Sequence, residues 1–171
     1  PMKHAHSRKA EFAFRWPAVP LNVVLVHPEI PPNTGNVARL CAATGTRLHL
    51  VEPLGFQITD AQLRRAGLDY WDAVQVQVHP SWAACRAALG AARLFLYSTG
   101  CSRRYDQVEY RPGDALVFGC ETKGLPDELL AAHADTACGI PILTRHVRSL
   151  NLSSAVAVVV YEALRQIDAR G

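Results

Sequence analysis

The sequence predicts an α/β fold with a mostly parallel, six-stranded sheet that carries helices on both faces. Short apolar runs recur along the chain, and segments with helical periodicity separate most of them. Strands that alternate with helices favour parallel pairing, in which both faces of the sheet are covered. The expected strands are 21–26, 47–51, 73–78, 93–98, 115–118 and 139–143.

Helices are expected where capping residues precede or follow a helical apolar pattern. The first begins after a cap at Asn33 or Thr34 and stops at Gly45. The last covers about 153–167, because its apolar residues fall on one helical stripe although its valines favour a strand. Three further helices are expected at 59–66, at 81–89 and after Pro126.

The composition indicates a single globular domain. The chain has 171 residues, of which 49% are hydrophobic and 19% charged, so it can bury a core and is not intrinsically disordered. We expect the domain to cover 21–168, after an N-terminal tail (1–20) that is disordered or foreign to it. The net charge of +3 permits an anionic partner such as RNA. No apolar run is long enough for a membrane span, so no membrane association is expected.

The five cysteines are widely spaced, and no two of them form a Cys-x-x-Cys pair. An odd number with this spacing argues against a disulfide framework and against a zinc site. We therefore expect no metal, and a reducing cytoplasmic location.

A first polar motif, Asn33-Thr34-Gly35-Asn36-Val37-Ala38-Arg39-Leu40, lies in the first expected helix. Asn36 and Arg39 would share its polar face near the positive N-terminus. An arginine there can bind a phosphate, and the neighbouring amide can hold its guanidinium. A capped helix with a solvated arginine is the simpler interpretation, and this motif alone leaves both open.

A second motif runs from Phe118 to Pro126 and contains Gly119 and Gly124 after an expected strand. The two glycines indicate a loop whose backbone approaches another group closely. The motif is neither a P-loop nor a dinucleotide fingerprint. An ordinary strand-to-helix turn is the alternative.

A third motif joins Ile140-Pro141-Ile142 to the last helix through the polar segment Arg148-Ser149-Leu150-Asn151-Leu152-Ser153. Asn151 or Ser153 can cap that helix, which is the structural interpretation of this segment.

Together the three motifs closely resemble those of the SPOUT RNA methyltransferases. The shared patterns are Asn-Thr-Gly-Asn-x-x-Arg-Leu, Phe-Gly-x-Glu-x-x-Gly-Leu-Pro, Ile-Pro and Ser-Leu-Asn-Leu-Ser. Segments 63–70 and 159–163 further resemble the small branch that methylates the ribose 2′-hydroxyl of the wobble nucleotide, a cytidine or uridine at position 34 of tRNA. The resemblance covers 21–166.

This resemblance implies a deep trefoil knot in the C-terminal part, with S-adenosylmethionine bound among the loops 96–100, 118–124 and 140–152. The catalytic residues implied are Arg39, Asn36, which would hold it, and Tyr161. A guanidinium is a poor general base, so we expect Arg39 to orient phosphate and ribose while the proton leaves late, to phosphate or water. The cofactor positions carried over by motif are Tyr97, Gly119, Gly124, Ile140, Ser149, Leu150 and Asn151.

The resemblance also implies a homodimer that pairs through the knotted region and the first helix, with each site drawing on both chains. Its positive surface would bind the tRNA anticodon arm, and affinity should then fall as salt rises. Charged pairs are also common on solvated faces, which is the alternative for each arginine. The candidate phosphate contacts are Arg64, Arg65, Arg103, Arg104 and Arg145.

Three other functions compete with this one. A related 2′-O-methyltransferase could act at another tRNA position or on rRNA, but such relatives often carry an added RNA-binding domain. An oxidoreductase would need a glycine fingerprint where Pro28–Pro32 stands. A non-catalytic RNA-binding protein on the same scaffold is disfavoured by the presence of Asn36, Arg39, Ser149 and Asn151.

Overall fold

The computed structural model describes residues 10–59, 61 and 72–171, and their alternating strands and helices confirm the predicted α/β class. The helix expected at 59–66, with Arg64 and Arg65, falls largely outside the described residues. The elements are β1 (Asn22–Val26), α1 (Pro31–Thr44), β2 (Arg47–Val51), β3 (Val76–His79), α3 (Trp82–Leu89), β4 (Leu94–Tyr97), β5 (Ala115–Phe118), α4 (Asp127–Ala132), a 3-10 turn (Ala134–Thr136), β6 (Ala137–Cys138) and α5 (Leu152–Arg170).

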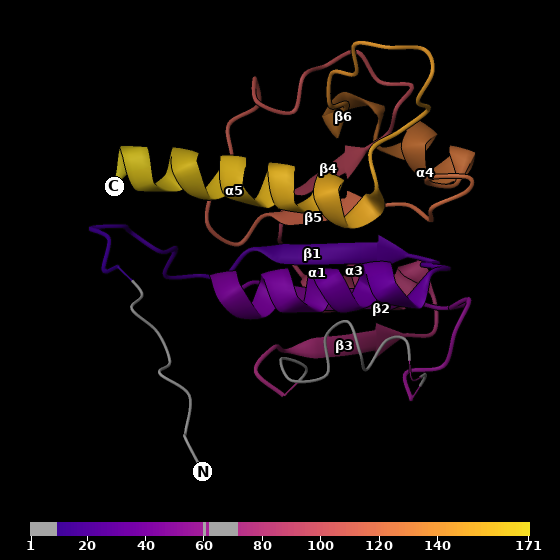
Figure 1. Cartoon of the computed structure of the whole chain (residues 1–171), viewed down its shortest axis with the longest axis horizontal. Coiled ribbons are helices and arrows are strands. Elements are labelled where there is room, and N and C mark those ends of the chain that lie inside the picture. Colours follow the sequence, from indigo (N-terminus) through magenta and orange to yellow (C-terminus); the bar gives the residue numbers. More distant parts are fainter. Residues whose placement is uncertain (1–9, 60, 62–71) are drawn as a thin grey trace.

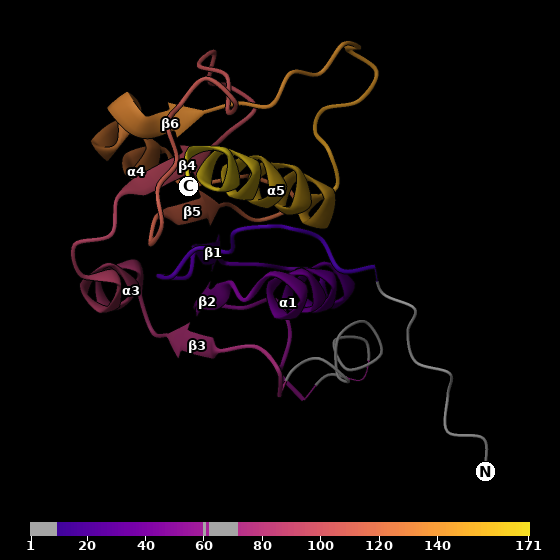
Figure 2. The ribbon, with the colours of Figure 1, turned by 90° about the vertical axis from the view of Figure 1, so that its left-hand side faces the viewer.

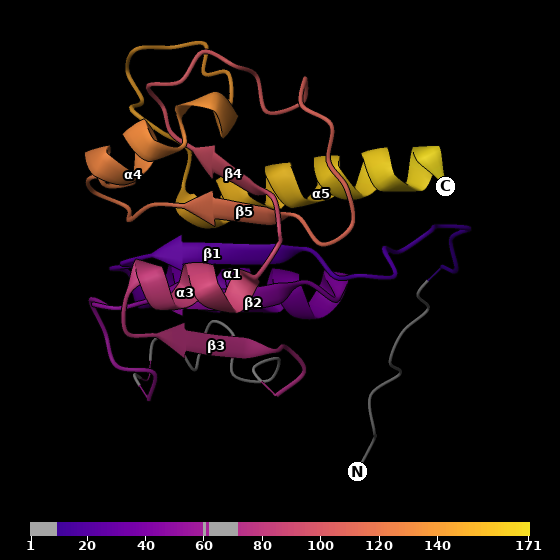
Figure 3. The ribbon, with the colours of Figure 1, turned by 180° about the vertical axis from the view of Figure 1, so that it is seen from behind.

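In the described part of the chain, six strands form one sheet in the order β3-β2-β1-β5-β4-β6. Every neighbouring pair is parallel. α1 and α5 cover one face, and α3 and α4 lie on the other (Figures 1, 2 and 3). This confirms the predicted parallel sheet with helices on both faces. It also explains why β1 and β5 are buried along their whole length.

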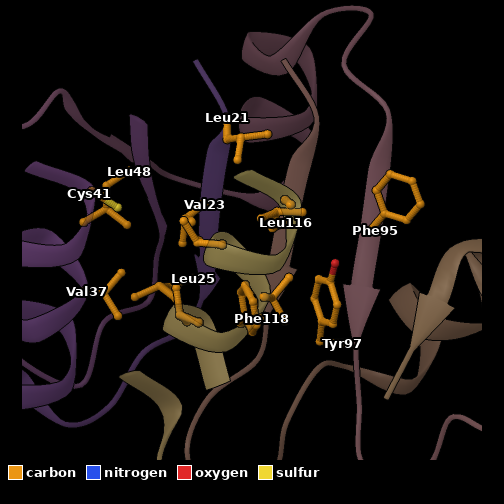
Figure 4. Packing of buried hydrophobic residues seen from close by; sticks show 14 of the residues in the cluster. Leu21, Val23, Leu25, Val37, Cys41, Leu48, Phe95, Tyr97, Leu116 and Phe118 are labelled. Atoms are coloured by element: carbon orange, nitrogen blue, oxygen red, sulfur yellow. The ribbon is translucent and has the colours of Figure 1, made fainter. Parts of the chain in front are cut away.

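The main core lies between the sheet and the pair α1 and α5. Figure 4 shows Val23 and Leu25 of β1 between Val37 of α1 and Phe118 of β5, with Tyr97 of β4 beyond them. The rings of Tyr97 and Phe118 stack with their centroids 4.7 Å apart. Burying each such side chain contributes about 1.5–3 kcal/mol, so this layer holds the two helices onto the sheet.

The first helix begins earlier than predicted. It starts at Pro31, whose missing N–H needs no partner at the first position of a helix, and Ile30 precedes it without a side-chain cap. Asn33 and Thr34 are therefore not caps; both lie inside the helix and are buried. The predicted stop is confirmed, because Gly45 adopts a left-handed conformation with φ of 66°.

The sixth strand was predicted in the wrong place. It is Ala137–Cys138, and the apolar segment 139–143 is not a strand. Pairing with β4 covers two residues, after which Gly139 makes an isolated bridge with Arg104. Pro141 cannot donate to a strand ladder, so the apolar run continues as a loop. β3 also lies later than expected, at Val76–His79 in place of 73–78.

β6 lies at the edge of the sheet beyond β4, and α5 returns from there to pack against α1 and β5. The chain thus crosses back over two strands after the edge strand, in the region where the resemblance places the knot. Among the described residues, no helix is long and apolar enough to cross a bilayer.

The second half of the N-terminal segment is folded against the domain. Phe14 packs against the main core, and the backbone N–H of Arg15 donates to Asp168 of α5 at 2.8 Å.

Candidate active site at the carboxyl edge of the sheet

The strands all point the same way, so the loops that follow them gather at one edge of the sheet (Figures 1 and 3). Ligands of open α/β sheets bind outside this carboxyl edge. The loops concerned follow β1, β4, β5 and β6, and they include all three segments in which the resemblance places the cofactor.

Two glutamates join the loop after β1 to the loop after β5. The carboxylate of Glu121 accepts hydrogen bonds from the backbone N–H groups of Glu29, at 3.0 Å, and Ile30. In return, the carboxylate of Glu29 accepts from the hydroxyl of Thr122 at 2.7 Å and from its backbone N–H at 3.2 Å. Hydrogen bonds from Cys120 and Thr122 hold the pKa of Glu29 below its usual value. This reciprocal pair fixes the two loops relative to each other.

The sequence analysis did not assign a role to either glutamate. A carboxylate in a loop usually faces solvent, so composition and periodicity give no signal for it. The available signal was Glu121 within the Phe-Gly-x-Glu pattern, which fixes its distance from the end of β5.

The loop after β5 closes on its own backbone. A Cβ atom on Gly119 would lie 2.1 Å from the carbonyl carbon of Gly124 and 2.1 Å from the nitrogen of Leu125. Gly124 has φ of 70°, and its N–H donates to the carbonyl of Cys120 at 3.0 Å. Both glycines are therefore required by the turn itself, and the close approach that they indicated is to the protein's own main chain.

The loop after β6 packs against the loop after β4 in a similar way. Gly139 donates to the carbonyl of Arg103 at 2.8 Å and accepts from the N–H of Tyr105 at 3.0 Å. A Cβ on Gly139 would lie 2.3 Å from the carbonyl oxygen of Cys101, so only glycine fits there. This glycine was also missed from the sequence, where it was read as the first residue of a strand.

A pocket of about 540 Å³ opens between these two loops. Such a volume suits a small-molecule ligand. Apolar residues from the third motif and basic residues from both loops line it. They are Thr99, Cys101, Ser102, Arg104, Gly139, Ile140, Pro141, Ile142, Thr144, Arg145, Val147 and Arg148.

The predicted cofactor residues divide around this pocket. Ile140 lines it, whereas Ser149 and Leu150 lie further along the same loop and are exposed. Gly119 and Gly124 belong to the neighbouring loop after β5 and are not among its lining residues. The predicted cofactor residues of these loops thus lie at one edge of the sheet, and Ile140 forms part of the pocket wall.

The side chain of Tyr97 faces the core. It is 7% exposed, its ring stacks on Phe118, and its hydroxyl lies 2.9 Å from that of Tyr110. Burial, together with the neighbouring Tyr110, raises the pKa of Tyr97 well above its ordinary value. Only the backbone of Tyr97 can therefore contribute to a ligand site.

The predicted catalytic residues lie on the two helices that cover the same face of the sheet. Asn36 and Arg39 are both exposed on α1, as the helical spacing predicted. Tyr161 is 50% exposed on α5, which packs against α1. All three side chains therefore reach the surface of the protein.

Asn151 joins the starts of these helices. Its amide donates to the side-chain oxygen of Asn33 at 3.0 Å, and its own side-chain oxygen accepts from the N–H of Ser153 at 2.9 Å. Asn151 is thus the helix cap that was predicted as one of two possibilities, and Asn33 is its partner on α1.

The arginines predicted to contact RNA differ in whether another group of the protein already binds their guanidinium. Arg104 forms an ion pair with Asp106 at 2.7 Å, and Arg103 donates to the carbonyl of Asp135. Arg145 is exposed in the loop after β6. Arg64 and Arg65 lie outside the described residues.

The amino-acid sequence of the chain matches a known family. The model of the SpoU rRNA Methylase family matches residues 20–161. The chain belongs to this family. The match confirms the methyltransferase resemblance that the three motifs predicted.

Similar SpoU-family proteins carry one name. The chain is 51% identical over 151 residues to the tRNA (cytidine(34)-2′-O)-methyltransferase of Methylovorus glucosotrophus, covering 88% of this chain and 97% of the relative. It is 50% identical over 152 residues to the protein of that name from Escherichia coli K12, covering 88% and 96%.

The chain is also similar to solved structures of RNA methyltransferases. One, described as giving structural insights into the 2-OH methylation of C/U34 on tRNA, has a TM-score of 0.81 at 48% identity and covers 85% of this chain and 95% of its own. An AdoMet-bound rRNA methyltransferase from Sinorhizobium meliloti has a TM-score of 0.76 at 26% identity, covering 85% of this chain and 56% of its own.

Proposed function

We propose that this protein transfers a methyl group to the ribose 2′-oxygen of nucleotide 34, a cytidine or uridine, in tRNA. The observation that carries the proposal is the identity of about half of all aligned residues with tRNA (cytidine(34)-2′-O)-methyltransferases over nearly the whole length of both chains. The predicted function is the same, and it was reached from the motifs at the carboxyl edge.

S-adenosylmethionine is the methyl donor that this function requires. The pocket between the loops after β4 and β6 fits a group of this kind. Ile140, Pro141 and Ile142 give it an apolar wall, and exposed main chain at the sheet edge can bind an adenine without charged side chains. When bound, the cofactor supplies an already reactive methyl group, so the protein contributes mainly alignment.

Arg39 orients the substrate in this proposal. Its guanidinium binds a phosphate next to the reacting ribose, Asn36 on the same helical face supports it, and Tyr161 of α5 lines the site. Arginine stays protonated at all physiological pH values, so the proton of the 2′-hydroxyl passes to phosphate or water.

The assembly completes the proposal. A homodimer that pairs through the knotted region and α1 would bring exposed side chains of α1 and α5 to a site shared by two chains. Val158 and Tyr161 are partly exposed on α5, which suits such a contact. The anticodon arm would lie across the basic loop that contains Arg145. Five free cysteines and a tRNA substrate are consistent with the cytoplasm.

The test is to incubate the full-length protein with tRNA and S-adenosylmethionine labelled in the methyl group, and then to map the modified nucleotide. We expect a 2′-O-methyl group at position 34. Ribose methylation at another position or in rRNA would move the protein to another branch of the family. Cofactor binding without transfer to any RNA would favour the non-catalytic alternative.

A further inference from the structure

Two histidines and a cysteine meet inside the protein, away from the carboxyl-edge loops. His49 comes from β2, His79 ends β3 and Cys85 lies on α3. All three are buried, and their ligand atoms lie within 4.8 Å of one another. Nδ1 of His49 is 2.9 Å from Nε2 of His79. The proposed methyl transfer uses none of these groups.

A fourth residue orients this cluster. The side-chain oxygen of Asn22 lies 3.1 Å from Nε2 of His49. An amide oxygen can only accept, so Nε2 of His49 carries the proton. Its Nδ1 then accepts a hydrogen bond from Nε2–H of His79, and a bound ion would replace this hydrogen bond. Metal-binding histidines typically donate their other ring N–H to a fixed oxygen in this manner.

We propose that His49, His79 and Cys85 bind a zinc-class divalent ion that fastens β3 and α3 to the rest of the sheet. Two imidazoles and one thiolate form a ligand set that zinc and cobalt prefer, and three protein ligands leave one position for water. The expectation that there is no metal site rested on the missing Cys-x-x-Cys pair. Here the ligands come from three separate elements, which local spacing cannot reveal.

Before an ion binds, the imidazole of His49 is a neutral base, whereas Cys85 is a thiol whose proton the ion must displace. Burial, with the nearby charges of His79 and Arg47, lowers the pKa of His49 to about 4, which keeps its imidazole neutral. Burial raises the pKa of Cys85 to about 11, so the thiol keeps its proton until an ion displaces it. Binding therefore forms a metal–sulfur bond and releases that proton to solvent.

One side of the cluster borders a pocket. His49 and Asn22 line a pocket of about 890 Å³ at the amino edge of the sheet, whereas His79 and Cys85 are not among its lining residues. An ion that enters from this pocket therefore meets His49 first.

The test is a cobalt titration of the chelator-treated, full-length protein. We expect a thiolate-to-cobalt charge-transfer band together with the visible bands of a tetrahedral ion, both abolished by one equivalent of zinc per chain. Cys85→Ala should lose the charge-transfer band. Cys41→Ala is the matched control, because Cys41 is equally buried but lies on α1, and it should keep the band.

A second variant distinguishes ion binding at the proposed site from nonspecific binding by other histidines of the protein. Asn22→Ala leaves all three ligands in place but removes the oxygen that orients His49, and it should weaken zinc binding about 10–100-fold. A folded wild-type protein without the charge-transfer band overturns the proposal. So does a Cys85→Ala protein that retains the band, or an Asn22→Ala protein with unchanged zinc affinity.

Discussion

The two edges of the sheet differ in what their polar groups do. At the amino edge, Asp114 is 2% exposed and accepts hydrogen bonds from the Arg93 side chain at 2.6 Å and the Arg111 backbone N–H at 2.7 Å. At the carboxyl edge, Arg145 is an exposed side chain in the loop after β6. The amino edge also has the larger pocket, about 890 Å³ against about 540 Å³.

The larger of these two pockets is therefore not the one in which the proposed reaction takes place. At the amino edge, Arg93 and Asp114 bind each other and stabilise the fold. At the carboxyl edge, where parallel strands place their ligand-binding loops, the Glu29–Glu121 pair holds the loops together, and Arg145 lies exposed beside the pocket. Substitutions should therefore reduce activity at one edge and stability at the other.

The largest effect is expected for Arg39→Ala. Loss of the group that orients the substrate should reduce methyl transfer to tRNA at least about 100-fold, while calorimetry shows cofactor binding largely intact. Arg86→Ala, on α3 across the sheet, is the control and should retain wild-type activity. An Arg39→Ala enzyme with full activity would remove this residue from the mechanism.

At the opposite edge, Asp114→Asn should lower the free energy of unfolding by about 2 kcal/mol. It weakens three hydrogen bonds to the carboxylate, although partial exposure of Arg93 limits the cost. Urea unfolding measures the loss, and methyl transfer per folded molecule should not change. A reduced rate in fully folded protein would contradict the division between the two edges.

Gly119→Ala tests the turn after β5. Its Cβ would overlap the backbone of Gly124, so the loop must move, and affinity for S-adenosylmethionine should fall at least about tenfold. Arg86→Ala, on α3 across the sheet, is the control and should bind the cofactor as the wild type does. Equal cofactor affinity for the two variants would show that the turn does not shape the site.

Asn151→Ala should destabilise the protein by about 1 kcal/mol, because α5 loses its cap and the link to Asn33. Thermal unfolding measures this change. Ser154→Ala, one turn away and exposed, should leave the melting temperature close to that of the wild type. The same melting temperature for both would mean that the cap is dispensable.

The smallest effects concern RNA binding. Arg145→Ala should lower the salt dependence of tRNA affinity by about one counterion, because an exposed arginine can neutralise a phosphate. Arg104→Ala should change it less, since Asp106 already balances that charge. The slope of log affinity against log salt measures both, and the reverse order would assign the phosphate contact to Arg104.

The parts of the fold that depend on local pattern were predictable. Apolar runs placed β1, β4 and β5 because strands covered on both faces are largely apolar. The sixth strand was misplaced, since Ile140-Pro141-Ile142 is equally apolar but forms a pocket wall. Apolar composition alone cannot distinguish these two environments.

The parts of the candidate site that lie within a single sequence motif could be predicted. Exposure of Asn36 and Arg39 on one helical face follows from their spacing. The Glu29–Glu121 pair and the His49–His79–Cys85 cluster could not be found in the same way. Each joins residues that are distant in sequence, and only the order of strands in the sheet brings them together.

That strand order has a consequence for how the chain acquires its structure. β1 is the first strand to be synthesised, yet it pairs with β5, which emerges only after β2, β3 and β4. The edge of β1 that pairs with β5 therefore stays unpaired until β5 has been synthesised. Contacts of this range make folding slow and leave intermediates open to aggregation until the central pair, β1 and β5, has formed.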